Sequence, residues 1–333
     1  MNLLQYWREN TRYGRLAAKG ILGMNCRNIR YISRYNPRSL YPLVDDKLKS
    51  KNLAIEHGVN VPDLIGVVSR QHDVAKISRI TSSLPGFCIK PAKGSGGKGI
   101  LVMDRVVDGV YYKTNGQAIS LLDIERHVSN ILAGLFSLGG KTDFALVESL
   151  IKVDDAFLQF THEGVPDLRV IVFRGFPVMS MMRLSCAASK GKANLHQGAV
   201  GVGLSMDSGR AVRAVKSGHP VSHHPDTQQS LSDLVVPQWM AMLELACACY
   251  DMTGLGYLGV DLVLDKYRGP LLLELNARPG LSIQVANDAG LLPRLRQIER
   301  IKKPEKYPIV ERVAYSRAHF AVQSQFEMTS SIV

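Results

Sequence analysis

A glycine- and lysine-rich segment between two strand-like runs constrains the fold of this chain more than any other feature. Residues 90–100 read KPAKGSGGKGI, and the runs GFCIKP and GILVMDR flank them. Glycines let a backbone approach phosphate oxygens and direct amide hydrogens at them, and lysines add positive charge. The segment therefore predicts a flap over nucleotide phosphates, with an ordinary glycine-rich hairpin as the alternative. The flap residues are Lys90, Gly94, Ser95, Gly96, Gly97, Lys98 and Gly99.

The surroundings of this loop exclude three familiar nucleotide motifs. A dinucleotide fingerprint needs a helix after its last glycine, and here a strand-like run follows. A P-loop fails because Ala92 stands where glycine is needed and Gly99 follows Lys98 where Ser or Thr is needed. A protein kinase would also carry HRD and DFG elements, which the chain lacks.

Polar oxygen-bearing side chains interrupt two apolar runs near the C-terminus. Glu274 and Asn276 lie two residues apart in LLLELNARPG, so on a strand they face the same way. Asp261 lies in GVDLVLD, which we expect to pair with that strand around residues 266–269. Clustered hard oxygen ligands suit magnesium. The alternative is a salt-bridge network in which these acids pair with Arg183 or Arg278.

Composition and charge narrow the function classes. The 333 residues are 46% hydrophobic and 21% charged, which is typical of a folded globular protein. The net charge of +12 is concentrated in residues 1–40 and 294–312, so we expect no nucleic-acid partner. The five cysteines form no CxxC pair, and we find no signal peptide or apolar run of 18 residues. These features predict a cytoplasmic protein with reduced thiols, with peripheral membrane association left open.

The basic N-terminal segment has two interpretations. Residues 6–35 predict one or two helices, with an apolar face that includes Tyr13, Leu16, Met24 and Tyr31. Such a segment could lie on an anionic membrane or bind an acidic partner. We favour a helix packed on the body of the protein. Downstream, we expect the histidines at 219, 223 and 224 to lie in an exposed loop.

The remaining pattern alternates helices and strands. We expect helices over residues 47–57, 71–84, 119–138 and 235–254. Strands are expected over 64–68, 86–91, 99–105, 144–151, 168–175, 176–185, 257–265 and 269–280. Two of these pairs should be hairpins, with turns at residues 174–175 and 266–269.

In this order the motifs resemble those of an ATP-grasp carboxylate–amine ligase. The glycine flap is followed by LVESLI, LRVIVFRG, NLHQG, GVDLVL and LLELNARPGL, over residues 42–298. The chain looks most like the alpha-L-glutamate-ligase-like branch, related to ribosomal-protein glutamate ligases. HPDT at residues 224–227 resembles sugar-transfer-associated ATP-grasp relatives.

The resemblance implies a role for individual residues of this sequence. Lys47 and Lys90 would contact phosphates, Glu148 and Leu150 the adenine edge, and Asp154 or Asp155 the ribose. Asp261, Glu274 and Asn276 would hold the metal. Arg169 and Arg183 would stabilise the transferred phosphate, with Asn194 and His196 near the acceptor. Arg278 could clamp the carboxylate substrate.

The implied fold class is α+β, an ATP-grasp fold whose two lobes clasp ATP. A short basic helical segment, residues 1–41, would replace a full N-terminal α/β domain. The N-terminal lobe would span 42–150, the C-terminal lobe with its metal site 151–300, and a tail 301–333.

The implied function is an ATP-dependent ligase that forms an amide bond through an acylphosphate. It would use ATP with magnesium, or manganese in its place, and add glutamate or another amino acid to a peptide, protein or small acceptor. Partners would include a protein acceptor, or a membrane-associated partner bound at the basic segment. The oligomeric state, with a dimer or a tetramer as possibilities, stays undecided. The alternative is a catalytically weak nucleotide-binding module that recruits partners as a sensor.

Overall fold

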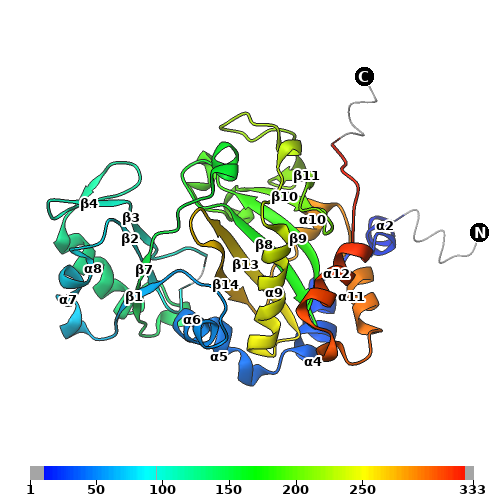
Figure 1. Cartoon of the computed structure of the whole chain (residues 1–333), viewed down its shortest axis with the longest axis horizontal. Helices are drawn as coiled ribbons and strands as arrows, with labels where there is room; N and C mark the ends of the chain where they lie inside the picture. Colours follow the sequence, from blue (N-terminus) through cyan, green and yellow to red (C-terminus); the bar gives the residue numbers. More distant parts are fainter. Residues whose placement is uncertain (1–10, 95, 327–333) are drawn as a thin grey trace, which may run out of the picture. The chain divides into compact units, whose positions relative to one another are not determined.

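The computed structural model describes residues 11–94 and 96–326, and its chain forms two compact units (Figure 1). Residues 42–152 form one unit, and the segments on either side of them form the other. Within the described residues, no helix has the length and apolar character needed to cross a membrane.

The unit of residues 42–152 is built on a four-stranded antiparallel sheet with the order β1-β7-β2-β3. A second antiparallel sheet of three short strands, β4-β5-β6, accompanies it. The strands are β1 (Leu64–Val68), β2 (Phe87–Pro91), β3 (Leu101–Met103), β4 (Arg105–Val107), β5 (Val110–Tyr112), β6 (Ala118–Ile119) and β7 (Ala145–Ser149). The helices are α5 (Pro42–Asp45), α6 (Lys47–Glu56), α7 (Lys76–Thr81) and α8 (Leu121–Leu132).

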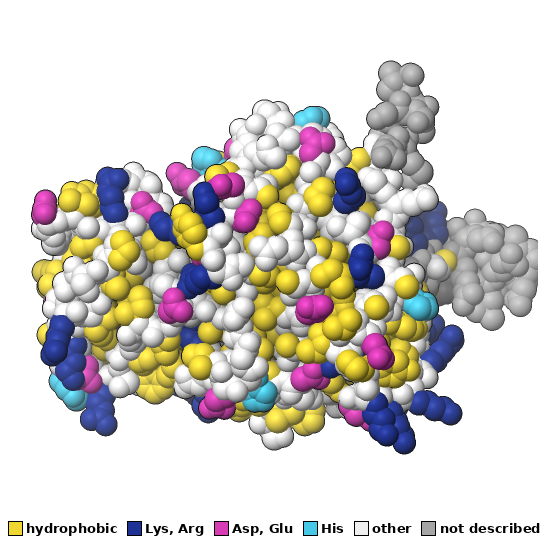
Figure 2. Space-filling view, in the orientation of Figure 1, with side chains coloured by type: hydrophobic (Ala, Val, Ile, Leu, Met, Phe, Trp, Pro, Cys, Tyr) yellow, Lys and Arg dark blue, Asp and Glu magenta, His cyan; other side chains and the backbone are white. Residues whose placement is uncertain are grey.

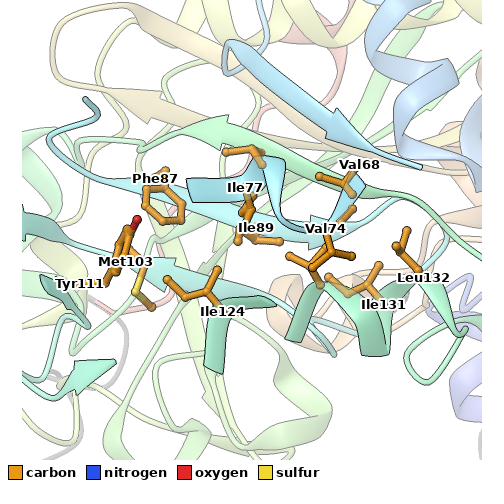
Figure 3. Close-up of a cluster of buried hydrophobic side chains, with 13 residues drawn as sticks. Val68, Val74, Ile77, Phe87, Ile89, Met103, Tyr111, Ile124, Ile131 and Leu132 are labelled. Carbon is orange, nitrogen blue, oxygen red and sulfur yellow. The ribbon is translucent and has the colours of Figure 1, made fainter. Parts of the chain in front are cut away.

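The core of this unit lies between its larger sheet and helices α7 and α8 (Figure 3). Phe87 and Ile89 point from β2 toward Ile124 and Ile131 of α8, and all four side chains are fully buried. Helix α8 begins at Ser120, whose hydroxyl accepts a hydrogen bond from the Asp123 amide. The expected helix over 119–138 is thus confirmed in its central part.

The other unit is built on a seven-stranded antiparallel sheet with the order β12-β11-β10-β9-β8-β13-β14. Helix α9 crosses in front of this sheet in Figure 1 and packs on β8, β9, β13 and β14, while α10 packs on β9–β11. The strands are β8 (Asp167–Phe173), β9 (Phe176–Leu184), β10 (Val200–Leu204), β11 (Ala211–Lys216), β12 (His219–Pro220), β13 (Tyr257–Asp265) and β14 (Gly269–Asn276). The helices that follow the sheet strands are α9 (Trp239–Thr253), α10 (Ile283–Asn287), α11 (Leu292–Glu299) and α12 (Ile309–His319).

Both expected hairpins in this unit are confirmed. Strands β8 and β9 are joined by Arg174 and Gly175, whose φ angles of 48° and 85° are those of a tight two-residue turn. Strands β13 and β14 pair from Gly259 opposite Asn276 to Asp265 opposite Gly269. One bulge between Asp261 and Leu262 adds a residue on β14.

The N-terminal segment is helical, but its predicted apolar face is wrong. Helix α2 (Arg12–Ala18) ends before a break, and α3 (Met24–Cys26), a π-helical turn (Arg27–Ile32) and α4 (Ser33–Tyr35) follow it. Tyr13, Leu16 and Met24 are 52–70% exposed. The break separates α2 from the later turns. Of the four residues named on the predicted face, Tyr31 is buried as expected, and Leu22 and Ile32 are buried with it. Residues 6–10 of the expected helix lie outside the described residues.

A buried asparagine ties this segment to β13 and to the chain that follows β14. The Asn36 side-chain amide donates to the carbonyl oxygens of Tyr257 and Ala277, at 2.7 and 3.0 Å. Its oxygen accepts a hydrogen bond from the Tyr257 amide at 2.8 Å. Arg27 adds a hydrogen bond to the Pro279 carbonyl at 2.7 Å. The N-terminal segment therefore holds in place the strand ends that carry Asp261 and Asn276.

Replacing this asparagine should destabilise the larger unit. Asn36→Ala leaves one buried amide hydrogen and two buried carbonyl oxygens without these hydrogen bonds, so we expect a loss of about 3 kcal/mol. Urea denaturation would measure it, with the exposed Asn25→Ala as the matched control. Equal stability of the two variants would show that Asn36 does not hold the segment.

Candidate functional site

A row of charged side chains crosses four strands of the seven-stranded sheet. Asp167 on β8 lies opposite Arg183 on β9, and Arg169 on β8 lies opposite Asp261 on β13. Asp261 in turn lies opposite Glu274 on β14. Directly opposite residues of antiparallel strands share one face of the sheet, and so do residues two apart on one strand. All five side chains therefore lie on the same face.

Asp261 is the centre of this row. Arg169 donates from Nε and Nη2 to the two carboxylate oxygens of Asp261, both at 2.5 Å, and Arg183 Nη2 lies 2.9 Å from Oδ2. Asp261 is only 2% exposed. Burial by itself would raise its pKa, but the two guanidiniums hold the pKa of this carboxyl below its usual range. Asp261 is thus a buried, ionised carboxylate with two positive partners.

The second buried acid of the row behaves in the opposite way. Asp167 pairs with Arg183 Nε and is also buried. Burial raises the pKa of Asp167 to about 6, and the nearby charge of Asp261 adds to this, although Arg183 opposes it. Arg183 is shared by both carboxylates, and their charges raise its pKa despite its burial. Asp167 and Asp261 can lie buried this close together because Arg169 and Arg183 compensate their charges.

The oxygen donors of the row fit a magnesium ion. Asp261 and Glu274 are cross-strand neighbours, and Asn276 Nδ2 lies 3.3 Å from Asp261 Oδ2. Two carboxylates and an amide carbonyl are the hard oxygen ligands that magnesium takes. No group of three His, Cys, Asp or Glu side chains suited to a metal occurs in the part of the chain that the structure describes, so the set depends on Asn276. The sequence-based alternative, an ion pair with Arg183, is also present at Asp261.

The segment expected near the acceptor lies on the same face as the row. Asn194 caps a short 3-10 turn (Leu195–Gln197) by accepting from the His196 amide at 3.0 Å. Gly201 lies opposite Arg183, and a Cβ on this glycine would lie 2.7 Å from Leu195 Cδ2. The glycine therefore lets the turn sit on the sheet beside Arg183. His196 itself is exposed.

Arg278 lies on the surface near the N-terminal segment. Its guanidinium stacks over the Tyr41 ring at 5.3 Å, and the side chain is exposed. The two ribose candidates differ in their contacts. Asp154 caps a 3-10 turn through the Ala156 amide at 3.0 Å, whereas exposed Asp155 pairs with Lys266 at 2.8 Å. Their roles stay predictions.

The smaller unit carries a second buried charge cluster. Glu148 on β7 pairs with Lys51 at 2.8 Å and with Lys90 at 2.6 Å, and all three side chains are at most 7% exposed. Burial lowers the pKa of Lys51, and the nearby Lys90 adds to this, while Glu148 opposes it. Two ammonium groups share one carboxylate, so the cluster has a positive charge to offer an anion.

The start of the glycine loop is hydrogen-bonded to helix α6, which carries Lys51 of this cluster. Lys47 Nζ donates to the Gly94 carbonyl at 2.7 Å, and the Lys47 amide donates to Ala92. Gly96, Gly97 and Gly99 have φ angles of 64°, 73° and 75°, which favour glycine. Lys98 is exposed, Leu150 is half-buried, and Ser95 lies outside the described residues.

Sequence reasoning missed two members of these clusters. Lys51 follows Lys47 by four residues, so both lie on one side of α6. The sequence gives no reason to expect Lys51, rather than Lys47, to be the buried lysine of the cluster. Asp167 precedes Arg169 by two residues on a strand, which is the spacing that could have placed it in the row.

The chain is α+β, with a glycine-rich loop between β2 and β3. The family model described as sugar-transfer associated ATP-grasp matches residues 26–300, so the chain belongs to that family. The resemblance drawn from the motifs and the predicted fold class are thereby confirmed.

Two curated relatives share part of their length with this chain. The chain is 26% identical over 259 residues to a "Probable alpha-L-glutamate ligase" of Parasynechococcus marenigrum, and 21% identical over 262 residues to one of Aeromonas salmonicida. These matches cover 77% and 78% of this chain but only 41% and 65% of those proteins. Among solved structures, D-cycloserine synthetase DcsG matches with a TM-score of 0.46 and 17% identity, over 89% of this chain and 81% of that one.

Removing the shared carboxylate of the smaller unit should leave two buried like charges. We expect Glu148→Gln to destabilise the protein by about 3 to 5 kcal/mol at neutral pH. Adding Lys51→Met should restore part of this loss, because one unpaired ammonium is removed. Chemical denaturation would measure both, with Glu56→Gln, at an exposed glutamate on the same helix as Lys51, as the control. A Glu148→Gln variant as stable as the control would show that the carboxylate is not needed to balance the lysines.

The expected exposed histidine loop is wrong at one position. His219 and His223 are exposed, but His224 is fully buried. Its Nε2 bonds to the Ser185 carbonyl at 3.1 Å, and its Nδ1 accepts from the Asp226 and Thr227 amides. Burial lowers the pKa of His224, with His162 and Lys216 adding to this and Asp226 opposing it. The neutral imidazole therefore organises the loop over residues 222–229.

This buried imidazole should make stability fall in acid. Its pKa is lower in the folded chain than in the unfolded one, so the unfolded chain binds the proton more readily. The contribution of His224 is present above about pH 6.5 and is lost as the pH falls through the lowered pKa. Thermal unfolding from pH 8 to 5 would test it, with His224→Gln losing this component and exposed His223→Gln keeping it. An unchanged pH profile in His224→Gln would contradict this role.

Proposed function

We propose that this chain is an ATP-dependent carboxylate–amine ligase that uses magnesium-bound ATP. The family membership supports the nucleotide. The Lys51–Glu148–Lys90 cluster supplies positive charge for phosphates, together with the glycine loop and Lys47. The row around Asp261 supplies oxygen ligands and two guanidiniums. That row, with carboxylates and guanidiniums on one face of the sheet, is the observation that carries the proposal.

The proposed reaction has two steps. The γ-phosphoryl group of ATP passes to a substrate carboxylate and gives an acylphosphate and ADP. An amine then attacks the acyl carbon, and phosphate leaves. The obstacle is repulsion between an anionic carboxylate and an anionic phosphate, and preorganised positive charge lowers it.

Each charged residue has a defined task in this proposal. Lys51, Lys90 and the loop lysines neutralise phosphate oxygens. Arg169 and Arg183 stabilise the γ-phosphoryl group during its transfer. To do so, each guanidinium interacts with the substrate as well as with Asp261. Bound to Asp261, Glu274 and Asn276, magnesium or manganese would supply further neutralisation of the phosphates. Glu148 pairs with the two buried lysines and holds them in place.

We propose an amino acid or a peptide as the substrate that meets the residues assigned to the acceptor. Glutamate is the first amino acid to test, because both curated relatives carry the name of a glutamate ligase. Asn194, His196 and Arg278 would contact the acceptor or clamp the second carboxylate. A protein acceptor, an association into a dimer or tetramer, and a cytoplasmic location belong to the same proposal.

A second candidate function is a catalytically weak nucleotide sensor. The observation that favours it is the pairing of both Asp261 oxygens with guanidiniums, because those pairs compete with a metal. Phosphate release on mixing the chain with ATP, magnesium and candidate amino acids separates the two functions. A sensor binds nucleotide without releasing phosphate, whereas the ligase releases phosphate only when its amino acid is present.

Removing one proposed metal ligand should abolish ATP use without unfolding the chain. We expect Glu274→Gln to lower amino-acid-dependent phosphate release by roughly 100-fold or more, because a carboxylate near the phosphates is lost. Glu274 is only half-buried, so we expect the thermal unfolding midpoint to change little. The exposed Glu305→Gln is the charge-matched control. Normal phosphate release by Glu274→Gln would show that this residue is not a ligand.

A further inference from the structure

The larger unit carries an exposed surface of basic side chains outside the proposed nucleotide residues. It comprises Arg30 and Arg34 of the N-terminal segment and Arg300, Lys302 and Lys303 after α11, with Ile29 beside them. We call these six residues the cationic surface. Figure 2 shows lysine and arginine side chains gathered at the lower right, where Figure 1 draws α4 and α11.

The two parts of the cationic surface are held together by specific contacts. Glu299, at the end of α11, accepts a hydrogen bond from the Tyr35 hydroxyl at 2.9 Å, and Arg34 Nη1 lies 3.8 Å from the same carboxylate. Arg174 donates to the carbonyl oxygens of residues 298, 299 and 301, all at 3.2 Å. The end of α11 and the N-terminal segment therefore form one supported surface.

The basic side chains point away from the body of the unit. Tyr31 and Tyr35 pack their rings on Phe173 of β8, at centroid distances of 5.5 and 4.9 Å. Arg30 and Arg34, four residues apart on the same helical stretch, are exposed on the other side, and Arg34 is 69% exposed. Ile29 is 70% exposed next to them.

The charge of this surface is strongly unbalanced. Residues 11–41 hold seven basic residues and no acidic one, and residues 292–306 hold six basic and two acidic residues. Glu299, one of those two acids, is already engaged by Tyr35 and Arg34. A surface with this excess attracts a polyanion, and it loses little by approaching one because its cations are already in water.

We propose that the cationic surface docks this protein on an anionic phospholipid bilayer. Charge complementarity is the first argument, because each lysine or arginine near an anionic membrane strengthens its attraction. The exposed apolar side chains are the second, since Ile29 and Met24, 70% and 64% exposed, could enter the interface beside the cations. A soluble polyanion offers no apolar phase for these side chains. This docking is independent of the ligase reaction.

Vesicle sedimentation would test the docking on the full chain. We expect the chain to sediment with vesicles of phosphatidylcholine mixed with phosphatidylglycerol, and to stay in solution with pure phosphatidylcholine. Raising the salt concentration should weaken the binding. The triple variant Arg30→Gln, Arg34→Gln, Lys302→Gln should bind the anionic vesicles roughly 100-fold less tightly, at about fivefold for each cation removed. The matched control removes three exposed cations elsewhere, with Arg79→Gln, Lys141→Gln and Lys190→Gln.

A second variant separates a bilayer from a soluble acidic partner. Ile29→Ser keeps every charge, so it should weaken vesicle binding several-fold and leave binding to heparin unchanged. Equal binding to neutral vesicles, or a triple variant that binds like its control, would overturn the proposal. Undiminished vesicle binding by Ile29→Ser, with full competition by heparin, would instead assign the surface to an acidic macromolecule. Because none of these residues belongs to the proposed catalytic machinery, failure here leaves the ligase proposal standing.

Discussion

The ion pairs between the buried Asp261 carboxylate and two guanidiniums are the interaction on which the site of the larger unit depends. An isolated buried carboxylate would lose its charge, because desolvation favours the neutral form. Arg169 directly across the β8–β13 pair and Arg183 one strand further keep it ionised. The same arginines allow Asp167 to lie nearby. The guanidiniums that keep Asp261 ionised also pair with both of its oxygens, so these contacts hold β8, β9 and β13 together at this point of the sheet.

The smaller unit also contains buried ion pairs, but with the signs of charge reversed. There one carboxylate, Glu148, serves two buried lysines, and a net positive charge remains. The row of the larger unit holds three acids and two arginines, whereas the cluster of the smaller unit holds one acid and two lysines. The N-terminal segment contributes through Asn36, whose three hydrogen bonds fix the strand ends next to Asn276. The N-terminal segment therefore supports the strands that carry the site.

Local patterns were enough to predict much of the fold. The turns at residues 174–175 and 266–269 each fix a hairpin through nearest neighbours in sequence. The shared face of Asp261 and Glu274 followed from one hairpin. From the sequence, the pairing of Asp261 with Arg183 was one of two open alternatives. Its pairing with Arg169 was not predicted, because the register between β8 and β13 is set by the whole sheet. Likewise, only the packing of α6 selects Lys51 over Lys47 for burial, and only the break after α2 explains the exposure of Leu16.

Manganese binding in the presence of a non-hydrolysable ATP analogue tests the central claim most directly. Electron paramagnetic resonance reports the free ion, so its signal falls as the protein takes up the metal–nucleotide complex. We predict a clear fall with the natural sequence and a much smaller one with Asp261→Asn, compared at matched protein and nucleotide concentrations with both variants folded. Equal uptake by the two proteins would contradict the account, because the charged row would then not hold the cation.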